Sequence, residues 1–274
     1  MNAFVREMRG AYAFVERNIN LMKRYWGWEA VWLIYSLVNS LAVTYIGAGM
    51  EQISGTALDT QYLITYLLVG TLIWSYLSVI FYSISEMIAW ERWEGTIEYT
   101  FMAPISRSTH LVGTTLFAIG YGIFRTLIIL AIVAAFFHLN LSGANLYGAV
   151  LLLLAGSVSF VGLGILAAIL PLLYPERGAQ MTNAAAAILL LISGVYYPVA
   201  TLPGWLQTIA AGSPATYVIE GMRACLLHGE PTSKLLPTVF ALIGAGVGVI
   251  AVGLAIFHRV EAYAKRAGRL KRSG

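Results

Sequence analysis

Residues 145–171 read NLYGAVLLLLAGSVSFVGLGILAAILP and contain no charged side chain. A helix needs about 20 consecutive apolar residues to cross the hydrocarbon core of a bilayer, and this stretch is long enough. It ends at Pro171, and a proline inside a helix removes a backbone hydrogen bond and favours a break. The stretch therefore predicts a transmembrane helix that ends near Pro171.

Five further apolar stretches have the same character, so we predict an all-α integral membrane protein with six transmembrane helices. The predicted spans are 29–50, 62–86, 111–137, 145–171, 180–197 and 235–257. These runs are continuously apolar, whereas the strands of a transmembrane β-barrel alternate apolar and polar residues in segments of about ten. A β-barrel therefore explains the pattern poorly.

The composition of the whole chain agrees with a membrane protein. Of its 274 residues, 59% are hydrophobic and only 11% are charged, whereas a soluble globular chain carries about 25% charged residues. The single cysteine, Cys225, excludes an internal disulfide framework. We expect residues 1–274 to form a single transmembrane domain.

The distribution of Lys and Arg predicts the orientation of the spans. Fourteen of the 17 basic residues fall on one side, in segment 1–28, the loops after the second and fourth spans, and the tail 258–274. Only Arg223 and Lys234 fall on the other side, and Arg125 lies within the third span. Because basic loops stay in the cytoplasm, we predict a multi-pass protein of the cell (inner or plasma) membrane with both termini cytoplasmic.

Segment 1–28 is predicted to be a helix in the membrane interface. Its apolar residues recur at steps of three and four, which places them on one face, and its basic residues fall mostly elsewhere. The apolar set is Phe4, Met8, Tyr12, Val15, Ile19, Met22 and Trp26. A simple basic anchor before the first span is the alternative, and it explains the charges but not the periodicity. No secretory signal peptide is recognisable, so the first span is expected to act as its own insertion signal.

Segment 87–107 is the most informative of the predicted cytoplasmic loops. Its apolar and acidic residues form two sets with helical spacing, so we predict a short helix with one apolar face and one acidic face. The apolar set is Trp90, Trp93, Ile97 and Phe101, and the acidic set is Glu91, Glu94 and Glu98. Pro104 is expected to end this helix, and Ser106 is placed to cap the next one.

The row of three glutamates in segment 87–107 indicates a basic partner. Like charges three or four residues apart on a helix repel by about 0.2–0.5 kcal/mol per pair. The row therefore gains most by facing positive charge on another molecule. The alternative is an amphipathic loop helix that is simply solvated.

Segment 198–231 is unusually apolar for an outer loop, and four prolines divide it into pieces too short to span. The prolines are Pro198, Pro203, Pro214 and Pro231. Irregular backbone at membrane depth survives only inside protein or along a cavity. We therefore predict two short helices that re-enter the outer leaflet as a hairpin before the last span, with Glu220 and Arg223 paired on one face. An ordinary outer loop with apolar packing is the alternative.

Two further features lie within the predicted spans. Arg125 would be costly in the middle of the membrane unless it is paired or reaches the interface, so it marks either a subunit contact or polar pathway, or a side chain that snorkels inward. Gly244 and Gly248 form a GxxxG pattern in the last span, which is typical of close helix packing, although the chain holds 27 glycines.

No pattern in the chain predicts catalysis. The HExxH zinc motif is absent, and no Gly-Lys pair occurs, so the phosphate-binding GxxxxGK[ST] loop is absent as well. We therefore predict no catalytic, cofactor-binding or metal-binding residue, and no nucleic-acid partner.

Two motifs resemble those of type 2 ABC exporter permeases, a family of polysaccharide, drug and lipid exporters. The first is EGTIE at 94–98 followed by APISR at 103–107, which resembles the family's E-x-G-T-L-E … P-x-S-R stretch. The second resembles the family's C-terminal signature, and it comprises SGVYYP at 193–198, Leu202, Pro203, Trp205, Leu206, Pro214, Tyr217, Glu220 and Arg223. The six spans, the N-terminal helix and the outer hairpin are also similar to the family's fold.

The resemblance implies a permease subunit of an ATP-driven exporter that moves a hydrophobic, drug-like, lipid or polysaccharide substrate out of the cytoplasm. Two permeases would pair as a homodimer within the lipid. Two separate ABC subunits would bind ATP and magnesium and carry the ATPase activity, so this chain would bind no cofactor and would not itself be an enzyme. The alternative is a membrane scaffold or channel subunit without ATP coupling.

The resemblance also assigns roles to residues. Segment 90–105 would be the coupling helix that docks into a groove of the ATPase, and its acidic character leads us to expect a basic groove there. The coupling residues are Trp90, Glu91, Trp93, Glu94, Gly95, Thr96, Glu98, Phe101 and Pro104. The hairpin 198–231 would close the outer mouth. Its residues, with the one preceding it, are Tyr197, Pro198, Pro203, Trp205, Pro214, Tyr217, Glu220 and Arg223.

Overall fold

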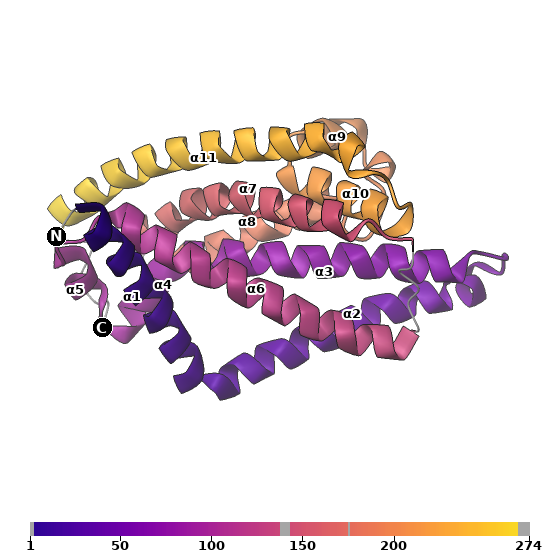
Figure 1. Ribbon diagram of the computed structural model, residues 1–274, viewed down its shortest axis with the longest axis horizontal. Helices are drawn as coiled ribbons and strands as arrows, with labels where there is room; N and C mark the ends of the chain where they lie inside the picture. The colour runs from indigo at the N-terminus through magenta and orange to yellow at the C-terminus, as the bar shows by residue number, and fades with distance from the viewer. Residues whose placement is uncertain (1–2, 138–142, 175, 268–274) are drawn as a thin grey trace.

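The computed structural model in Figure 1 describes residues 3–137, 143–174 and 176–267, without the side chains of Ala3, Phe4 and Phe101. Within these residues every regular element is a helix, which confirms the all-α prediction. The elements are α1 (Ala3–Arg24), α2 (Trp26–Ser54), α3 (Thr60–Ser85), α4 (Met87–Glu94), α5 (Ile97–Met102), α6 (Arg107–Phe137), α7 (Leu146–Leu173), α8 (Gly178–Ile192), the 3₁₀ turn η1 (Val199–Thr201), α9 (Gly204–Ala210), α10 (Pro214–Leu227) and α11 (Thr232–Arg266).

Five of the described helices are long and apolar enough to cross a membrane, namely α2, α3, α6, α7 and α11. They run back and forth along the long axis of the molecule (Figure 1). The predicted fifth span, 180–197, forms α8, which has only 15 residues. At 1.5 Å per residue it is about 22 Å long, shorter than the roughly 30 Å hydrocarbon core. The six-span count therefore stays a prediction.

Several predicted boundaries differ from the structure, among them the ends of the fourth and the last span. Helix α7 continues through Pro171 to Leu173, because a proline in the last turn removes one hydrogen bond without ending the helix. Helix α11 continues to Arg266, so the predicted tail 258–274 is largely helical where it is described. Residues 268–274 lie outside the described residues.

Helices α3 and α7 form the centre of the bundle. In their most apolar windows 56% and 61% of residues are buried, against 17–22% in α2, α6 and α11. The central pair is joined by a hydrogen bond of 2.7 Å between the hydroxyls of Tyr76 and Ser157, which satisfies two polar groups inside the apolar core. The three outer helices carry apolar residues on their exposed faces, and a bilayer covers such a surface. The protein is therefore a multi-pass membrane protein.

Glycine allows α11 to approach α7 closely. A Cβ atom at Gly246 would lie 2.7 Å from the backbone nitrogen of Ser159, and the Ser159 hydroxyl donates to the carbonyl of Leu242 at 2.8 Å. The predicted GxxxG pair has no part in this contact, because a Cβ at Gly244 or Gly248 would meet no atom within 4 Å. Gly246 lies on the face that meets α7, whereas the two predicted glycines face away from it.

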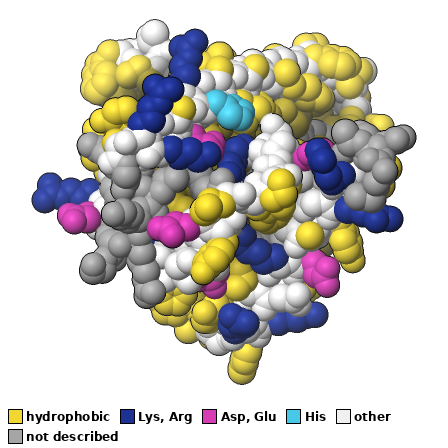
Figure 2. All heavy atoms as spheres, turned by 90° about the vertical axis from the view of Figure 1, so that its left-hand side faces the viewer, with side chains coloured by type: hydrophobic (Ala, Val, Ile, Leu, Met, Phe, Trp, Pro, Cys, Tyr) yellow, Lys and Arg dark blue, Asp and Glu magenta, His cyan; other side chains and the backbone are white. Residues whose placement is uncertain are grey.

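The two ends of the bundle differ in charge. Helices α1, α4 and α5, the start of α6 and the end of α11 lie together at the left of Figure 1, and we call this the basic end. Lys and Arg side chains are spread over its surface (Figure 2). The opposite end, which we call the hairpin end, holds the α2–α3 turn with α9 and α10. The grouping of both described chain ends at the basic end agrees with the predicted orientation, but the cytoplasmic assignment stays a prediction.

The close contact of α7 with α11 predicts a position-specific effect of Gly246→Ala. The added methyl group overlaps backbone atoms of Ser159, and overpacking of this kind typically costs about 1–3 kcal/mol. We expect a lower thermal midpoint of the purified protein in detergent. Gly244→Ala, two positions away with open space around it, should leave the midpoint nearly unchanged. Equal midpoints for the two variants would contradict the packing described here.

Candidate functional site

Segment 87–107 forms two helices instead of the single predicted one. Gly95 has φ +74°, a left-handed conformation that glycine adopts at little cost. The amides of Gly95 and Thr96 bond back to the carbonyls of Arg92 and Glu91, at 3.1 and 2.9 Å, which is the Schellman arrangement that ends helices. Helix α4 therefore stops at Glu94, and α5 begins after Thr96 in a new direction.

Glu91 does not belong to an exposed acidic face, contrary to the prediction. Its side chain is 0% exposed and lies between the Arg17 guanidinium, at 3.0 Å, and Nε2 of His110, at 3.2 Å. Burial raises the pKa of the Glu91 carboxyl, but the hydrogen bonds and positive charge of His110 and Arg17 outweigh burial and hold it below its usual value. Glu91 is thus an ionised internal link between α4, α1 and α6.

Helix α1 is fastened along the start of α6. The Phe14 ring stacks on His110 with 4.2 Å between centroids, and a Cβ at Gly113 would lie 2.6 Å from the carbonyl oxygen of Ala11. The Glu7 carboxylate accepts hydrogen bonds from the hydroxyls of Ser106 and Thr109. These hydrogen bonds lower the pKa of Glu7.

The apolar residues that the periodicity singled out do not all share one environment, since Met22 lines a cavity inside the bundle. Met8 and Tyr12 are exposed, as a helix in the membrane interface requires. The side chain of Phe4 lies outside the described part of the chain. The helix is confirmed, and its place in the interface stays a prediction.

The rest of the 87–107 segment is anchored to other helices on its inner side. Arg92 donates to the carbonyl of Leu172 in the last turn of α7, at 3.3 Å. Arg107 donates to the carbonyl of Thr100 at 2.8 Å and pairs with Glu261 of α11 at 3.1 Å. Ile97 is 1% exposed in the main core. The segment therefore contacts α1, α6, α7 and α11.

The outer side of the segment is exposed and apolar. Trp93, Tyr99 and Met102 are 63%, 80% and 84% exposed, and we call this group with Glu98 the exposed tip. The predicted apolar face is wrong, because Trp93 is exposed whereas Ile97 is buried in the main core. Glu94 is half-buried, and Glu98 and Pro104 are exposed. The side chain of Phe101 lies outside the described residues.

The predicted cap at Ser106 is confirmed. The Ser106 hydroxyl accepts a hydrogen bond from the Thr109 amide at 3.1 Å.

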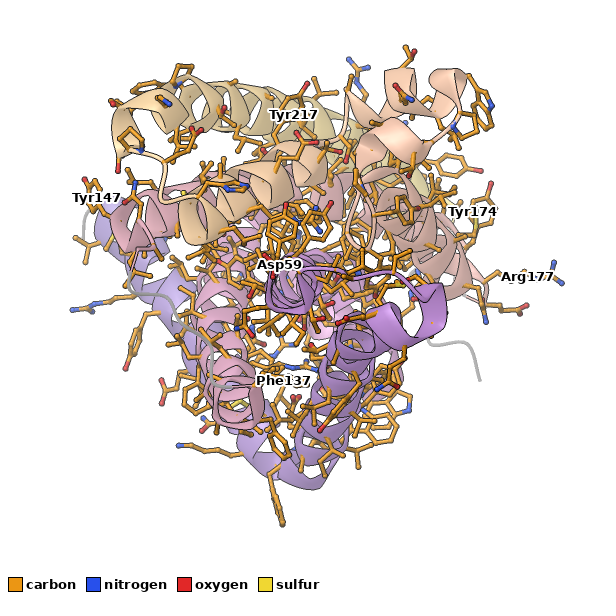
Figure 3. All side chains as sticks on the ribbon, turned by 90° about the vertical axis from the view of Figure 1, so that its right-hand side faces the viewer. Asp59, Phe137, Tyr147, Tyr174, Arg177 and Tyr217 are labelled. Atoms are coloured by element: carbon orange, nitrogen blue, oxygen red, sulfur yellow. The ribbon has the colours of Figure 1, made fainter. Side chains whose placement is uncertain are left out.

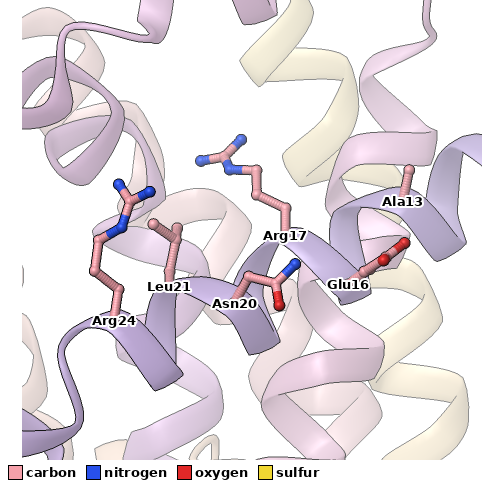
Figure 4. A pocket seen from close by; sticks show the side chains of 6 residues that line it. All are labelled: Ala13, Glu16, Arg17, Asn20, Leu21 and Arg24. Atoms are coloured by element: carbon pink, nitrogen blue, oxygen red, sulfur yellow. The ribbon is translucent and has the colours of Figure 1, made fainter.

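Arg17, which pairs with Glu91 of this segment, also lines a shallow hollow on the polar face of α1. The volume of the hollow is about 380 Å³. Figure 4 shows Arg17 and Arg24 extending on the same side of α1, with Glu16 and Asn20 beside them. The hollow is open and carries both signs of charge. Because Glu91 is buried, only two of the three predicted glutamates, Glu94 and Glu98, contribute to the surface of the 87–107 segment.

Arg125 binds a neighbouring helix of the same chain. Its guanidinium donates to the carbonyl of Trp32 at 2.7 Å and to the Ser36 hydroxyl. One turn earlier on α6, the Tyr121 hydroxyl donates to the Glu29 carboxylate. These bonds join α6 to α2, so Arg125 has an intrachain structural partner that neither predicted alternative included.

The hairpin end contains the two predicted short helices, α9 and α10. Figure 3 looks onto this end, where Tyr217 of α10 and Asp59 of the α2–α3 turn both lie. The Tyr197 hydroxyl bonds to the carbonyl of Leu191 at 2.6 Å, and that of Tyr217 bonds to the carbonyl of Ala211 at 2.7 Å. Trp205 is exposed. Pro198 and Pro203 precede η1 and α9, and Pro214 is the first residue of α10. Re-entry into the outer leaflet stays a prediction.

The predicted pair of Glu220 and Arg223 is wrong. Arg223 is buried and donates to the carbonyls of Gly194 and Val195, at 2.8 and 2.7 Å, while Glu220 is exposed. The Arg223 guanidinium also lies over the Tyr66 ring, 3.5 Å from its centroid, and bonds to the carbonyl of Tyr66 at 3.4 Å. A planar guanidinium satisfies several carbonyls at once. These hydrogen bonds are therefore favoured over an ion pair with the exposed carboxylate of Glu220.

A glycine of α3 makes room for the Arg223 contacts. A Cβ at Gly70 would lie 2.1 Å from the carbonyl oxygen of Val195 and 2.7 Å from Nη2 of Arg223. Arg223 thereby ties α10 to α3 and to the residues after α8. The prediction that Arg223 belongs to the outer mouth is compatible with this place, and its gating role stays a prediction.

Sequence reasoning missed several partners that the structure brings together. Arg17 lies 74 positions from Glu91, and Tyr66 lies 157 positions from Arg223, so neither pair leaves a local spacing signal. His110 follows the predicted coupling segment and belongs to no motif, so nothing in the sequence marks it as a partner of Glu91. Gly70 carries no motif, although a glycine inside an apolar span is a general sign of close approach.

The buried position of Glu91 predicts a large effect of Glu91→Gln on stability. Removing one charge of a buried pair typically costs about 3–5 kcal/mol, and we expect about 3 kcal/mol because Arg17 is partly exposed. The matched change Glu98→Gln, in the exposed tip, should cost almost nothing. Thermal unfolding in detergent measures both.

The lowered pKa of Glu91 predicts that the stability effect of Glu91→Gln depends on pH. Because the folded-state pKa of Glu91 is held below its ordinary value of 4.5, its stabilisation is present above that pH and is lost as pH falls through the lower folded-state value. The difference in stability between the wild type and Glu91→Gln should therefore disappear below about pH 4.5. If this difference is absent at pH 7, or increases in acid, the ionised link is ruled out.

The hydrogen bonds of the Arg223 guanidinium predict that Arg223→Lys destabilises the hairpin end. A single ammonium cannot reach the three carbonyls together while it covers Tyr66, and lost hydrogen bonds of this kind cost about 1–3 kcal/mol. Faster proteolysis between α8 and α10 and a lower thermal midpoint are expected. Arg177→Lys serves as control, because Arg177 is exposed and points away from the molecule (Figure 3). Equal behaviour of the two variants would argue against this role.

The sequence was compared with those of known proteins. The family described as "ABC-2 type transporter" matches residues 10–227, and a search of curated protein sequences returns no match. The matched region begins in α1, contains the whole 87–107 segment and ends with α10. It confirms the resemblance that the two motifs indicated, and it implies a partnership with ABC ATP-binding subunits. The chain belongs to the ABC-2 type transporter family, as a membrane-spanning permease component and not as the ATPase.

Proposed function

We propose that the chain is the permease of an ATP-driven exporter, in which two copies pair and two separate ABC subunits bind ATP and magnesium. Membership of the family supports the permease role. Export from the cytoplasm, the homodimer and the two-to-two assembly are part of the proposal.

The exposed tip of the 87–107 segment carries the proposal. Tyr99 and Met102 are 80% and 84% exposed at the end of the bundle, while the inner side of the same segment is held by buried charges. Exposed clusters of large apolar side chains, and aromatic and Met residues in particular, mark protein contacts. An anchored segment that presents such a tip is suited to docking on a partner that moves.

The contacts of Glu91 supply a route for that movement. A partner that pulls on α4 also displaces α1 through Arg17 and α6 through His110, because both side chains contact the buried carboxylate of Glu91. Helix α6 runs the length of the bundle toward the hairpin end (Figure 1). The tilt of packed helices as rigid bodies is a common form of conformational change. The proposed result is alternate opening of the two ends of the pathway.

The hairpin of α9 and α10 would then close the outer mouth. Arg223 holds α10 against α3 and the residues after α8, so a displacement of α3 reaches the hairpin through these bonds. The cargo class we propose is a hydrophobic, drug-like, lipid or polysaccharide molecule. The apolar exposed faces of α2, α6 and α11 support entry from lipid, although a fold does not itself determine cargo.

Glu98→Lys tests the docking role of the exposed tip. We expect the wild type, co-expressed with its ABC subunit, to purify as a complex whose ATPase activity requires that subunit. Reversal of one charge at the centre of a docking surface should weaken the complex about tenfold or more. Pull-down yield and ATPase activity in proteoliposomes are the measurements.

Glu51→Lys provides the matched control for Glu98→Lys, because Glu51 is an exposed glutamate at the hairpin end. It should leave the yield of the complex unchanged. ATP hydrolysis by the permease alone would contradict the proposed division of labour. Normal assembly and transport by Glu98→Lys would instead favour a solvated loop, or a scaffold or channel without ATP coupling.

A further inference from the structure

A second cavity lies at the basic end, where α1, α2, α3, α4 and α6 meet, with a volume of about 160 Å³. Its wall combines aromatic rings and carboxylates, and we refer to it as the elbow cavity. We propose that the elbow cavity binds the ammonium group of an amphiphile whose apolar chain remains in the lipid. The cavity is formed by this chain alone, so the inference stands independently of ATP coupling.

The size of the elbow cavity suits a headgroup and not a whole drug-sized molecule. One water molecule needs about 10–15 Å³ of such volume, so 160 Å³ accepts a group of several non-hydrogen atoms. Pockets that enclose a drug-sized ligand measure about 300–1,000 Å³. A ligand of the elbow cavity must therefore leave most of its body outside.

The aromatic residues of the wall favour a cation. Tyr25, Trp28, Trp90 and Phe117 contribute to the wall from α2, α4, α6 and the α1–α2 junction. The face of an aromatic ring attracts an ammonium group, with Trp the strongest, and sets of such rings recognise quaternary ammonium ligands. Trp28 and Trp90 are 54% and 44% exposed, so each has free ring surface to offer.

The charges of the wall agree with the aromatic residues. Glu29 and Glu94 both line the elbow cavity, and Glu94 forms no ion pair with any described residue. Arg17 and His110 also border it, but both are engaged with Glu91. Oxygen Oε2 of the buried Glu91 has no hydrogen-bond partner among the described residues. The unbalanced charge near the elbow cavity is therefore negative.

The position of the elbow cavity explains why the ligand should be an amphiphile. Trp28 and Trp32 at the start of α2 are both partly exposed, and Trp at this level of a span is typical of the membrane–water interface. A headgroup at this depth places its chain along the exposed apolar face of α2. A soluble cation without a chain would lack the favourable transfer of that chain from water into lipid and should bind more weakly.

The probe for the elbow cavity is dodecyltrimethylammonium, with dodecyl maltoside as the uncharged compound of equal chain length. Both are titrated calorimetrically, below their micellar concentrations, into the intact chain in phosphatidylglycerol nanodiscs, with empty nanodiscs subtracted. We expect saturable binding of the ammonium compound only. Trp90→Ala and Glu94→Gln should each weaken it about fivefold, since each removes one ring or one charge that faces the cation.

Two matched variants separate the elbow cavity from general effects. Glu98→Gln and Trp205→Ala alter an exposed glutamate and an exposed tryptophan outside the cavity, and they should keep wild-type affinity. Equal binding of the charged and uncharged compounds, or full affinity in both Trp90→Ala and Glu94→Gln with each variant folded as judged by its thermal midpoint, would overturn the proposal.

The natural ligand could be a lipid headgroup or a cationic cargo, and the lipid of the nanodisc separates the two sources. Half of the phosphatidylglycerol is replaced either by phosphatidylcholine or by an uncharged galactolipid, because both lower the negative surface charge that attracts dodecyltrimethylammonium to the membrane. If phosphatidylcholine lowers the affinity more than the galactolipid does, a choline headgroup shares the elbow cavity. If the two lipids give equal affinity while tetraphenylphosphonium competes, the elbow cavity is a site for cationic cargo. Failure of both competitors would overturn the assignment to either source.

Discussion

The carboxylate of Glu91 holds the basic end together. It is fully buried, it lies within 3.2 Å of two partners, and those partners belong to two other helices. A lone buried carboxylate would be costly, so Glu91 is compatible with this fold only while Arg17 and His110 remain in place. The positions of α1 and of the start of α6 are therefore linked to the position of α4. Everything proposed for the exposed tip depends on that link.

The hairpin end is organised by a cation in the way that the basic end is organised by an anion. Arg223 satisfies carbonyls at the end of α8 and in α3, and Gly70 provides the space. Between the two ends the bundle relies on apolar packing around α3 and α7, with few polar contacts such as that of Tyr76 with Ser157. Stability thus comes mainly from the middle, while the charged links at either end determine which helices move together.

Much of this architecture could be predicted from the sequence, for physical reasons that are local. Long apolar runs such as 145–171 identify helices because backbone groups in lipid must be satisfied within the segment. The cap at Ser106 and the breaks at the prolines of 198–231 are also local. The family motifs at 94–98 and 193–198 carried the permease assignment, which composition alone did not provide.

The arrangement of the candidate site could not be predicted, because it depends on residues distant in sequence. Glu91, Glu94 and Glu98 look equivalent in a row, yet only Glu91 meets Arg17 across 74 positions. Because the left-handed Gly95 turns the second half of the segment, a periodicity that assumes one continuous helix places Trp93 and Ile97 on one face, although Trp93 is exposed and Ile97 is buried. Glu220 is the nearest charge to Arg223 in sequence, but backbone carbonyls of other helices are the better partners.

Cysteine crosslinking tests the central claim, that the exposed tip docks on an ABC subunit, most directly. Cys225 is the chain's single cysteine and is buried, so Cys225→Ser gives a background for single cysteines introduced by Tyr99→Cys or, at the hairpin end, Trp205→Cys. With a short bifunctional reagent in membranes, the account predicts a permease–ATPase adduct for Tyr99→Cys whose yield changes when ATP is added, and none for Trp205→Cys. No adduct at position 99, or equal adducts at both positions, would contradict it.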